Sequence, residues 1–225
     1  MKELYDSGFH HPLAAYVAGL LLLLALARRL SFLHAYLTVF LVAILADATV
    51  TGAWSPVPLG TPQYTFFSVL FIVLGDLRYF LLAERVTLPR ETLLSTLRFS
   101  LPMSLLVPVA TGIMSRTIPF MADDRVLYAV YELSMVVIVL ALDRYRFGNR
   151  VVDSALRRWV HEVSLLFAAL YFGWGACDLL ILAGVELGHV LRIIPNVLYY
   201  AAFLPFVLWR SPGSESDGVS RLGVR

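Results

Sequence analysis

The chain has 225 residues, of which 59% are hydrophobic and only 15% are charged. Soluble domains carry about 25% charged residues, so this composition indicates that lipid is the solvent. A mean hydropathy of +0.77 agrees with that. The formal net charge of +2, without a basic stripe, argues against a nucleic-acid partner. The single cysteine, Cys177, excludes an internal disulfide and a cysteine-based zinc site.

Seven apolar stretches are long enough to cross the hydrocarbon core, which takes about 20 helical residues. They run over residues 11–30, 32–54, 63–84, 94–115, 126–143, 159–184 and 190–209. We therefore predict an all-α fold, a polytopic bundle of seven transmembrane helices over residues 1–210. The polar, Gly- and Ser-rich residues 211–225 are predicted to form a disordered cytoplasmic tail. We expect the membrane to be a bacterial inner membrane.

Basic residues in short loops mark the cytoplasmic side of a membrane protein. With the amino terminus outside, the cytoplasmic segments hold twelve of them: Arg28, Arg29, Arg85, Arg90, Arg144, Arg146, Arg150, Arg157, Arg158, Arg210, Arg221 and Arg225. The outer segments hold four: Lys2, Arg116, Arg125 and Arg192. This asymmetry predicts that the amino terminus lies outside the cell and the carboxy terminus in the cytoplasm.

Two predicted spans carry polar and aromatic residues on one helical face. In the sixth span, Tyr171, Trp174 and Asp178 recur at i, i+3 and i+7. In the seventh, three more residues recur at i, i+4 and i+7: Arg192, Asn196 and Tyr199. Ionisable groups within spans usually face the bundle interior and mark function. Asp47 and Glu132, from two other spans, fall at the same outer level under the predicted orientation.

These residues predict an outward-facing polar and aromatic pocket for a small polar or cationic ligand. The protein would then be a multi-pass sensor or transporter without catalytic activity, and aromatic rings would stack on the ligand. The alternative is that the same groups only tie the spans together. The predicted ligand-binding set is Asp47, Glu132, Asp178, Arg192, Asn196, Tyr171, Trp174 and Tyr199.

The third span places Asp76 and Arg78 together in VLGDLRYFLLAER. Residues i and i+2 of a helix point about 200° apart, so these two cannot pair with each other. Asp76 must therefore find a donor on another span, either as a structural hydrogen bond or in a direct functional role. The longer Arg78 and Arg98 are expected to extend towards the inner headgroups. Gly75 would let a neighbouring helix approach closely.

Three segments, LGDLRYFL around Asp76, CDLLILA around Asp178 and YYAAFL at 199–204, resemble the lysoplasmalogenase family of membrane hydrolases. They look like that family's paired-aspartate and terminal tyrosine segments. The resemblance implies an intramembrane lipid-modifying hydrolase in which Asp76 and Asp178 act as paired acid and base. The predicted depths put these two aspartates in different halves of the membrane. The hydrolase is therefore kept as the alternative function, and no catalytic residue is assigned.

Seven spans, an outside amino terminus and a seventh span ending VLWRS are similar to the microbial opsins. Their chromophore is a Schiff base on a seventh-span lysine. The only lysine in this chain is Lys2, so covalent retinal is excluded. A ligand-free, opsin-like scaffold is the second alternative, and the sequence identifies no cofactor.

The five histidines lie at the predicted membrane interfaces, His34 and His161 on the inner side and the other three on the outer side. Neither group has the helical spacing of metal ligands, so no metal site is predicted. The loop between the fifth and sixth spans, DRYRFGNRVVDSALRR, is basic. We expect it to contact anionic membrane lipid, with a cytoplasmic partner as the alternative.

Overall fold

The computed structural model describes residues 2–26, 32–88 and 92–212, and every regular element within them is helical. Seven helical segments are long and apolar enough to cross a membrane, which confirms the predicted number of spans and points to an integral membrane protein. They are Lys2–Leu24, Phe32–Val50, Pro62–Thr87, Leu93–Thr117, Asp124–Arg150, Ser154–Leu182 and Leu187–Arg210.

Some predictions fall outside the described residues. These are the predicted disorder of residues 213–225 and five of the twelve arginines assigned to the cytoplasmic side, Arg28, Arg29, Arg90, Arg221 and Arg225. Those predictions stay predictions.

The first four spans are built mostly from single long helices. The first consists of α1 (Lys2–Tyr5), a kinked segment η1 (Phe9–Leu13) and α2 (Ala14–Leu26). The next three are α3 (Phe32–Val50), α4 (Pro62–Thr87) and α5 (Leu93–Thr117). A short turn, η2 (Pro119–Ala122), follows α5.

The last three spans differ in regularity. The fifth runs from α6 (Asp124–Leu142) through a π-helical turn η3 (Asp143–Phe147) into α7 (Gly148–Arg150). The sixth is the unbroken α8 (Ser154–Leu182). The seventh has four segments: α9 (Leu187–Leu191), α10 (Ile193–Val197), the π-helical turn η4 (Leu198–Ala202) and α11 (Phe203–Arg210). Irregular backbone at membrane depth is tolerated where it is buried in protein or lines a cavity.

Four helices begin at a polar capping residue that accepts a hydrogen bond from a first-turn backbone N–H. Thr61 caps α4, Thr92 caps α5, Asp123 caps α6 and Asp153 caps α8. The caps of α6 and α8 lie three and six residues before the predicted starts of these spans. Hydropathy alone placed these starts too late, because the first helical turn contains polar residues that reach the membrane surface.

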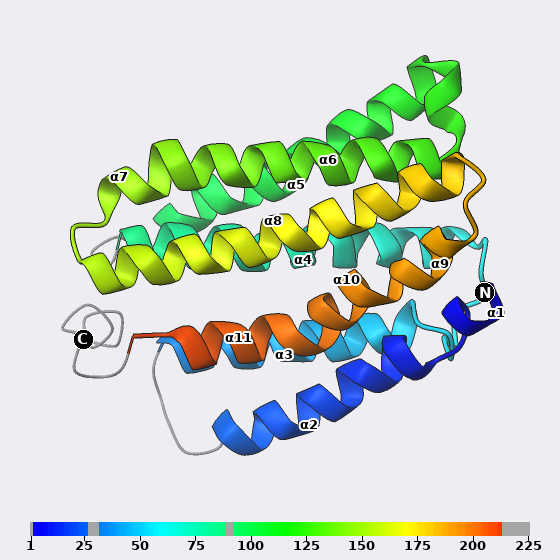
Figure 1. The fold of residues 1–225 in the computed structure, drawn as a ribbon. Helices are drawn as coiled ribbons and strands as arrows, with labels where there is room; N and C mark the ends of the chain where they lie inside the picture. Colours follow the sequence, from blue (N-terminus) through cyan, green and yellow to red (C-terminus); the bar gives the residue numbers. More distant parts are fainter. Residues whose placement is uncertain (1, 27–31, 89–91, 213–225) are drawn as a thin grey trace.

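The spans pack in chain order, each against the next, and η4 returns to contact α2 (Figure 1). Contacts between α4 and α8, and between α11 and α3, cross the interior. The spans of α2 and α5 are poorly buried and expose leucines, including Leu20, Leu24 and Leu106, where lipid would lie. The body of the first span is therefore peripheral.

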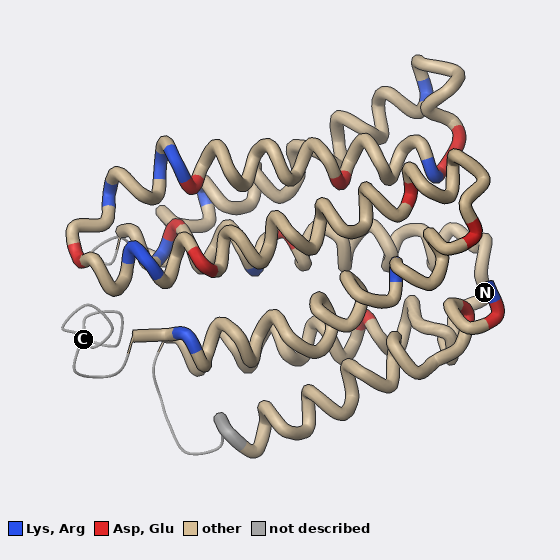
Figure 2. Tube along the Cα trace, viewed as in Figure 1, with Lys and Arg blue, Asp and Glu red and all other residues tan. Residues whose placement is uncertain are grey.

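The first and last described helices, α1 and α11, lie at opposite ends of the bundle (Figure 1). We call them the amino-terminal end, which holds the residues around 51–61, 118–123 and 183–186, and the carboxy-terminal end. Figure 2 shows arginines gathered at the carboxy-terminal end. The segments at this end, namely η3, α7, the start of α8 and the end of α11, contain Arg144, Arg146, Arg150, Arg157, Arg158 and Arg210. The charge asymmetry therefore coincides with the two ends, and which end faces the cytoplasm stays a prediction.

A buried carboxylate at the carboxy-terminal end holds part of the basic loop in place. Glu84 accepts two hydrogen bonds from Arg146, of 2.7 and 2.9 Å, and one of 3.3 Å from Arg150. Arg157 donates to the Val151 carbonyl oxygen at 2.6 and 3.0 Å. Three arginines of the loop that we expected to contact lipid are thus engaged within the protein.

Candidate ligand-binding site

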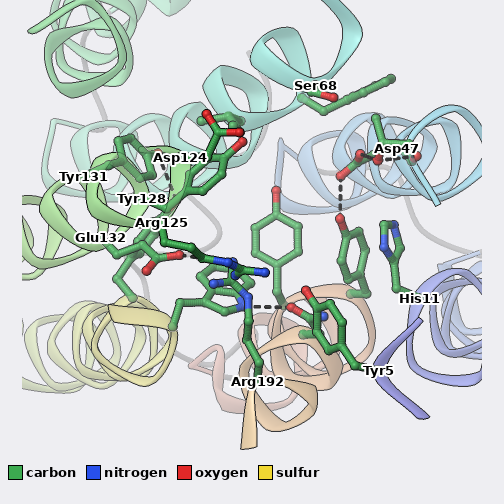
Figure 3. A pocket seen from close by; sticks show the side chains of 18 of the residues that line it. Tyr5, His11, Asp47, Ser68, Asp124, Arg125, Tyr128, Tyr131, Glu132 and Arg192 are labelled. Carbon is green, nitrogen blue, oxygen red and sulfur yellow. Dashed lines mark hydrogen bonds and ion pairs between the residues drawn. The ribbon is translucent and has the colours of Figure 1, made fainter. Parts of the chain in front are cut away.

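A cavity of about 440 Å³ opens at the amino-terminal end of the bundle (Figure 3). Pockets that hold small molecules measure about 300–1,000 Å³. Its lining comes from the first segment of the chain and from α3, α4, α6, α8 and the seventh span, and α5 is the described span that contributes none. One wall is built by α6, α8 and α10, and the facing wall by α3, α4 and the amino-terminal segment.

Seven of the eight predicted site residues line this one cavity: Asp47, Glu132, Tyr171, Trp174, Arg192, Asn196 and Tyr199. The eighth, Asp178, is fully buried and lies outside the lining. It accepts a hydrogen bond of 2.8 Å from Arg125 and a second, short one from Arg192. Asp178 therefore positions two arginines of the lining and does not itself face the cavity.

The wall formed by α6, α8 and α10 carries paired charges. Arg192 bonds to Asp178 and also contacts Glu132 at 3.4 Å. One oxygen of Glu132, Oε2, and the Nε of Arg192 are buried without a protein partner. Two arginines, Arg125 and Arg192, thus meet two carboxylates, and the formal charges of this wall cancel.

Asp47 on the facing wall forms no such pair with an arginine of the cavity lining. It is buried, and its two oxygens accept hydrogen bonds from the Thr51 hydroxyl at 2.6 Å and the Tyr200 hydroxyl at 3.0 Å. Within the described part of the chain, Asp47 forms no ion pair. The ring of Tyr200 stacks on His11 with centroids 3.9 Å apart. Asp47 therefore presents a carboxylate that is held by hydroxyl groups alone.

A row of aromatic side chains forms the floor of the cavity. Ring centroids lie 5.5 Å apart for Tyr171 and Trp174, 5.2 Å for Trp174 and Tyr199, and 4.8 Å for Tyr199 and Tyr200. The indole N–H of Trp174 donates to the Asn196 side-chain oxygen at 2.7 Å. The helical periodicity predicted that Tyr171 and Trp174, one turn apart on α8, share a face, and both line the cavity.

Asn196 ties the amino-terminal segment to the cavity. Its amide nitrogen donates to a ring nitrogen of His10 at 3.1 Å, and the other ring nitrogen of His10 is 2.5 Å from the Tyr5 carbonyl oxygen. Tyr5 and His11 then line the cavity. Sequence reasoning missed both. An asparagine within a span needs hydrogen-bond partners for its amide group, and Asn196 therefore indicated that some partner exists. The sequence does not say which segment supplies it.

Asp76 lies in the layer below the aromatic floor. It is fully buried and accepts hydrogen bonds from the hydroxyls of Tyr131, at 2.5 Å, and of Tyr171. This confirms that Asp76 finds its donors on other spans. Asp76 and Asp178 are enclosed by different partners and neither lines the cavity, so no observation favours an acid–base pair.

Arg78 contradicts our expectation that it extends to the inner headgroups. It is 0% exposed, and its guanidinium lies 3.8 Å from the ring centroid of Tyr199 and 4.3 Å from that of Phe203. From Leu70 to Thr87 no residue of α4 is exposed, because α3, α5 and α8 pack around it, and Arg78 therefore cannot reach the surface. Arg98, on the peripheral α5, is exposed.

The histidines and carboxylates do not form a metal centre in the described ranges, where no group of three or more His, Cys, Asp or Glu could hold an ion. No protein-family model matches the chain, and neither a curated protein nor a solved structure matches it.

Proposed function

We propose that the chain is a sensor or transporter whose cavity faces the outside of the cell and holds a small organic cation without reacting with it. The observation that carries this proposal is Asp47, a carboxylate that faces an aromatic-lined cavity and has no direct ion-pair partner among the residues that the structure describes. The outward orientation rests on the distribution of basic residues, which favours a cytoplasmic carboxy-terminal end.

The formal charges around the cavity favour a cation. Two arginines, Arg125 and Arg192, and three carboxylates, Asp47, Asp124 and Glu132, line the cavity, which leaves a formal charge of 2 − 3 = −1. Because protein of lower effective dielectric constant than water lines the cavity, an excess negative charge there attracts a cation more strongly than it would in bulk solvent.

The aromatic floor favours an organic cation over a metal ion. A cation over an aromatic face gains about 0.5–2 kcal/mol, depending on how far it is desolvated. Tyr171, Trp174, Tyr199 and Tyr200 lie next to one another on the floor, so several faces or edges are within reach of one bulky ammonium group. A substituted ammonium would place its charge by Asp47 and its alkyl groups against the rings.

The test is calorimetric binding of benzyltrimethylammonium to the detergent-solubilised protein, compared with its uncharged carbon isostere. We expect the cation to bind and the isostere to bind far more weakly. Asp47→Asn should lower cation affinity about 10- to 100-fold, since a hydrogen-bonded or charged contact of about 1.5–3 kcal/mol is lost.

The matched control is Asp123→Asn, which makes the same chemical change at the cap of α6, outside the cavity lining. Asparagine caps helices as well as aspartate does, so affinity should not change. Equal binding of cation and isostere, or an Asp47→Asn variant that binds as the unmodified chain does, would contradict the proposal.

A further inference from the structure

Arg78 is a buried cation that the candidate site does not use. One guanidinium nitrogen, Nη1, donates to the Tyr199 carbonyl oxygen at 3.3 Å, whereas Nε and Nη2 are buried without a protein partner. No carboxylate of the described residues forms an ion pair with it. Arginine stays protonated in proteins, and an uncompensated buried charge costs several kcal/mol. Some negative group must therefore offset this charge.

A second, much smaller cavity lies directly against Arg78. Its volume of about 10 Å³ is at the lower limit for one water molecule. Arg78 and Asp47 are the two charged residues of its lining. Asp47, Phe71 and Tyr199 also line the main cavity, so the two spaces share a wall that is one side chain thick.

Asp47 is better placed than Asp76 to offset the charge of Arg78. Asp76 does not line the small cavity. Asp47 does line the cavity, and each of its oxygens, with one hydroxyl partner, has lone-pair capacity left. Arg78 and Asp47 thus lie on the same small space, and no other charged residue of the described chain lines it.

We propose that Arg78 is the internal counter-ion of Asp47 across the small cavity that both residues line, and that it sets how tightly the main cavity holds a cation. The effect of Arg78 on cation binding rests on the proposed function. A bound cation and Arg78 would act on the same carboxylate from opposite sides of the shared wall, and would repel each other through it. Arg78 thereby weakens the binding of cations and keeps Asp47 compensated when no ligand is present.

The first test measures benzyltrimethylammonium affinity in three variants. Arg78→Met removes the charge and keeps an unbranched chain between the rings of Tyr199 and Phe203, and should bind about tenfold more tightly. Arg78→Lys keeps the charge and should bind as the unmodified chain does. Arg98→Met removes an exposed arginine from α5 and should change nothing. A folded Arg78→Met variant with unchanged or weaker affinity would overturn the proposed effect on binding.

The second test needs no ligand, so it separates failure of this inference from failure of the proposed function. Melting temperatures are measured for Asp47→Asn, Arg78→Met and the double variant. Since each single substitution leaves the other charge uncompensated, the double variant should lose clearly less than the sum of the two single losses. Additive losses would overturn the Arg78–Asp47 pair, even if the unmodified chain binds cations. Coupled losses in a chain that binds no cation would support the pair and refute the proposed function.

Discussion

Asp47, Asp76 and Asp178 are all buried, yet each is satisfied by a different chemistry. Asp178 has two arginines, Asp76 has two tyrosine hydroxyls, and Asp47 has a threonine and a tyrosine hydroxyl. Arginine partners fix a carboxylate as part of the framework, whereas hydroxyl partners leave its charge available. Asp47 is the one of the three that also lines the cavity, and this makes it the anchor in our account.

The hydroxyl groups that hold Asp76 should stabilise the fold. Tyr171→Phe and Tyr131→Phe each remove one donor to a fully buried carboxylate, and each should lower the free energy of unfolding by about 0.5–2 kcal/mol. Equilibrium unfolding in mixed detergent micelles measures this. Tyr128→Phe is the control, since this tyrosine lines the same cavity but does not bond to Asp76. A loss in Tyr128→Phe as large as in the other two would contradict the assignment.

At the scale of single residues, helical periodicity predicts which residues share a face, but it does not predict how deeply a long basic side chain is buried. The face shared by Tyr171 and Trp174 follows from helical periodicity, and the structure places both in the cavity. The burial of Arg78 does not follow, because a long basic side chain is compatible with both the interior and the headgroups. Only the number of helices around α4 decides between them, and that depends on the whole bundle.

At the scale of elements, the contact between α4 and the seventh span depends on a glycine. A Cβ on Gly75 would lie 2.1 Å from the hydroxyl oxygen of Tyr199, so any larger residue would displace Tyr199 or the turn η4 that carries it. This bears out the close approach expected at Gly75. The same turn carries Tyr200, the donor to Asp47, and the effect should therefore extend to the cavity.

We predict that Gly75→Ala lowers the free energy of unfolding by about 1–3 kcal/mol, as overpacking does, and weakens cation binding. Gly112→Ala is the matched control, because nothing lies within 4 Å of a Cβ at that position of α5. Alanine is the better helix former, so this variant should be unchanged or up to about 1 kcal/mol more stable. Unfolding and calorimetric binding of both variants decide the matter. A Gly75→Ala variant as stable as Gly112→Ala would contradict the packing described.

The existence of the spans was predictable and their ends were not. Each span shows as a long apolar run, because every face of a lipid-embedded helix must be apolar or buried. The second span was predicted to end at residue 54, but α3 ends at Val50. There the Ser55 hydroxyl donates a hydrogen bond to the Val50 carbonyl oxygen. Such local hydrogen bonds do not alter hydropathy, and the pattern therefore misses them.

At the scale of the whole molecule, the orientation is a separate prediction. Leu59→Cys and Val152→Cys place a thiol on opposite ends of the bundle, at positions that are 78% and 95% exposed. The native Cys177 is buried and should contribute little background. In intact cells a membrane-impermeant maleimide should label position 59 directly and position 152 only after permeabilisation. The reverse pattern would turn the cavity towards the cytoplasm.

Native mass spectrometry of the gently solubilised protein with benzyltrimethylammonium shows whether the cavity holds a small cation anchored by Asp47. We expect one discrete adduct on the unmodified chain, with the mass of the cation, that is lost in Asp47→Asn and kept in Asp123→Asn. A cation adduct that persists in Asp47→Asn would contradict the role of Asp47 as the anchor. A bound lysolipid that prevents the cation from binding would contradict a cation site.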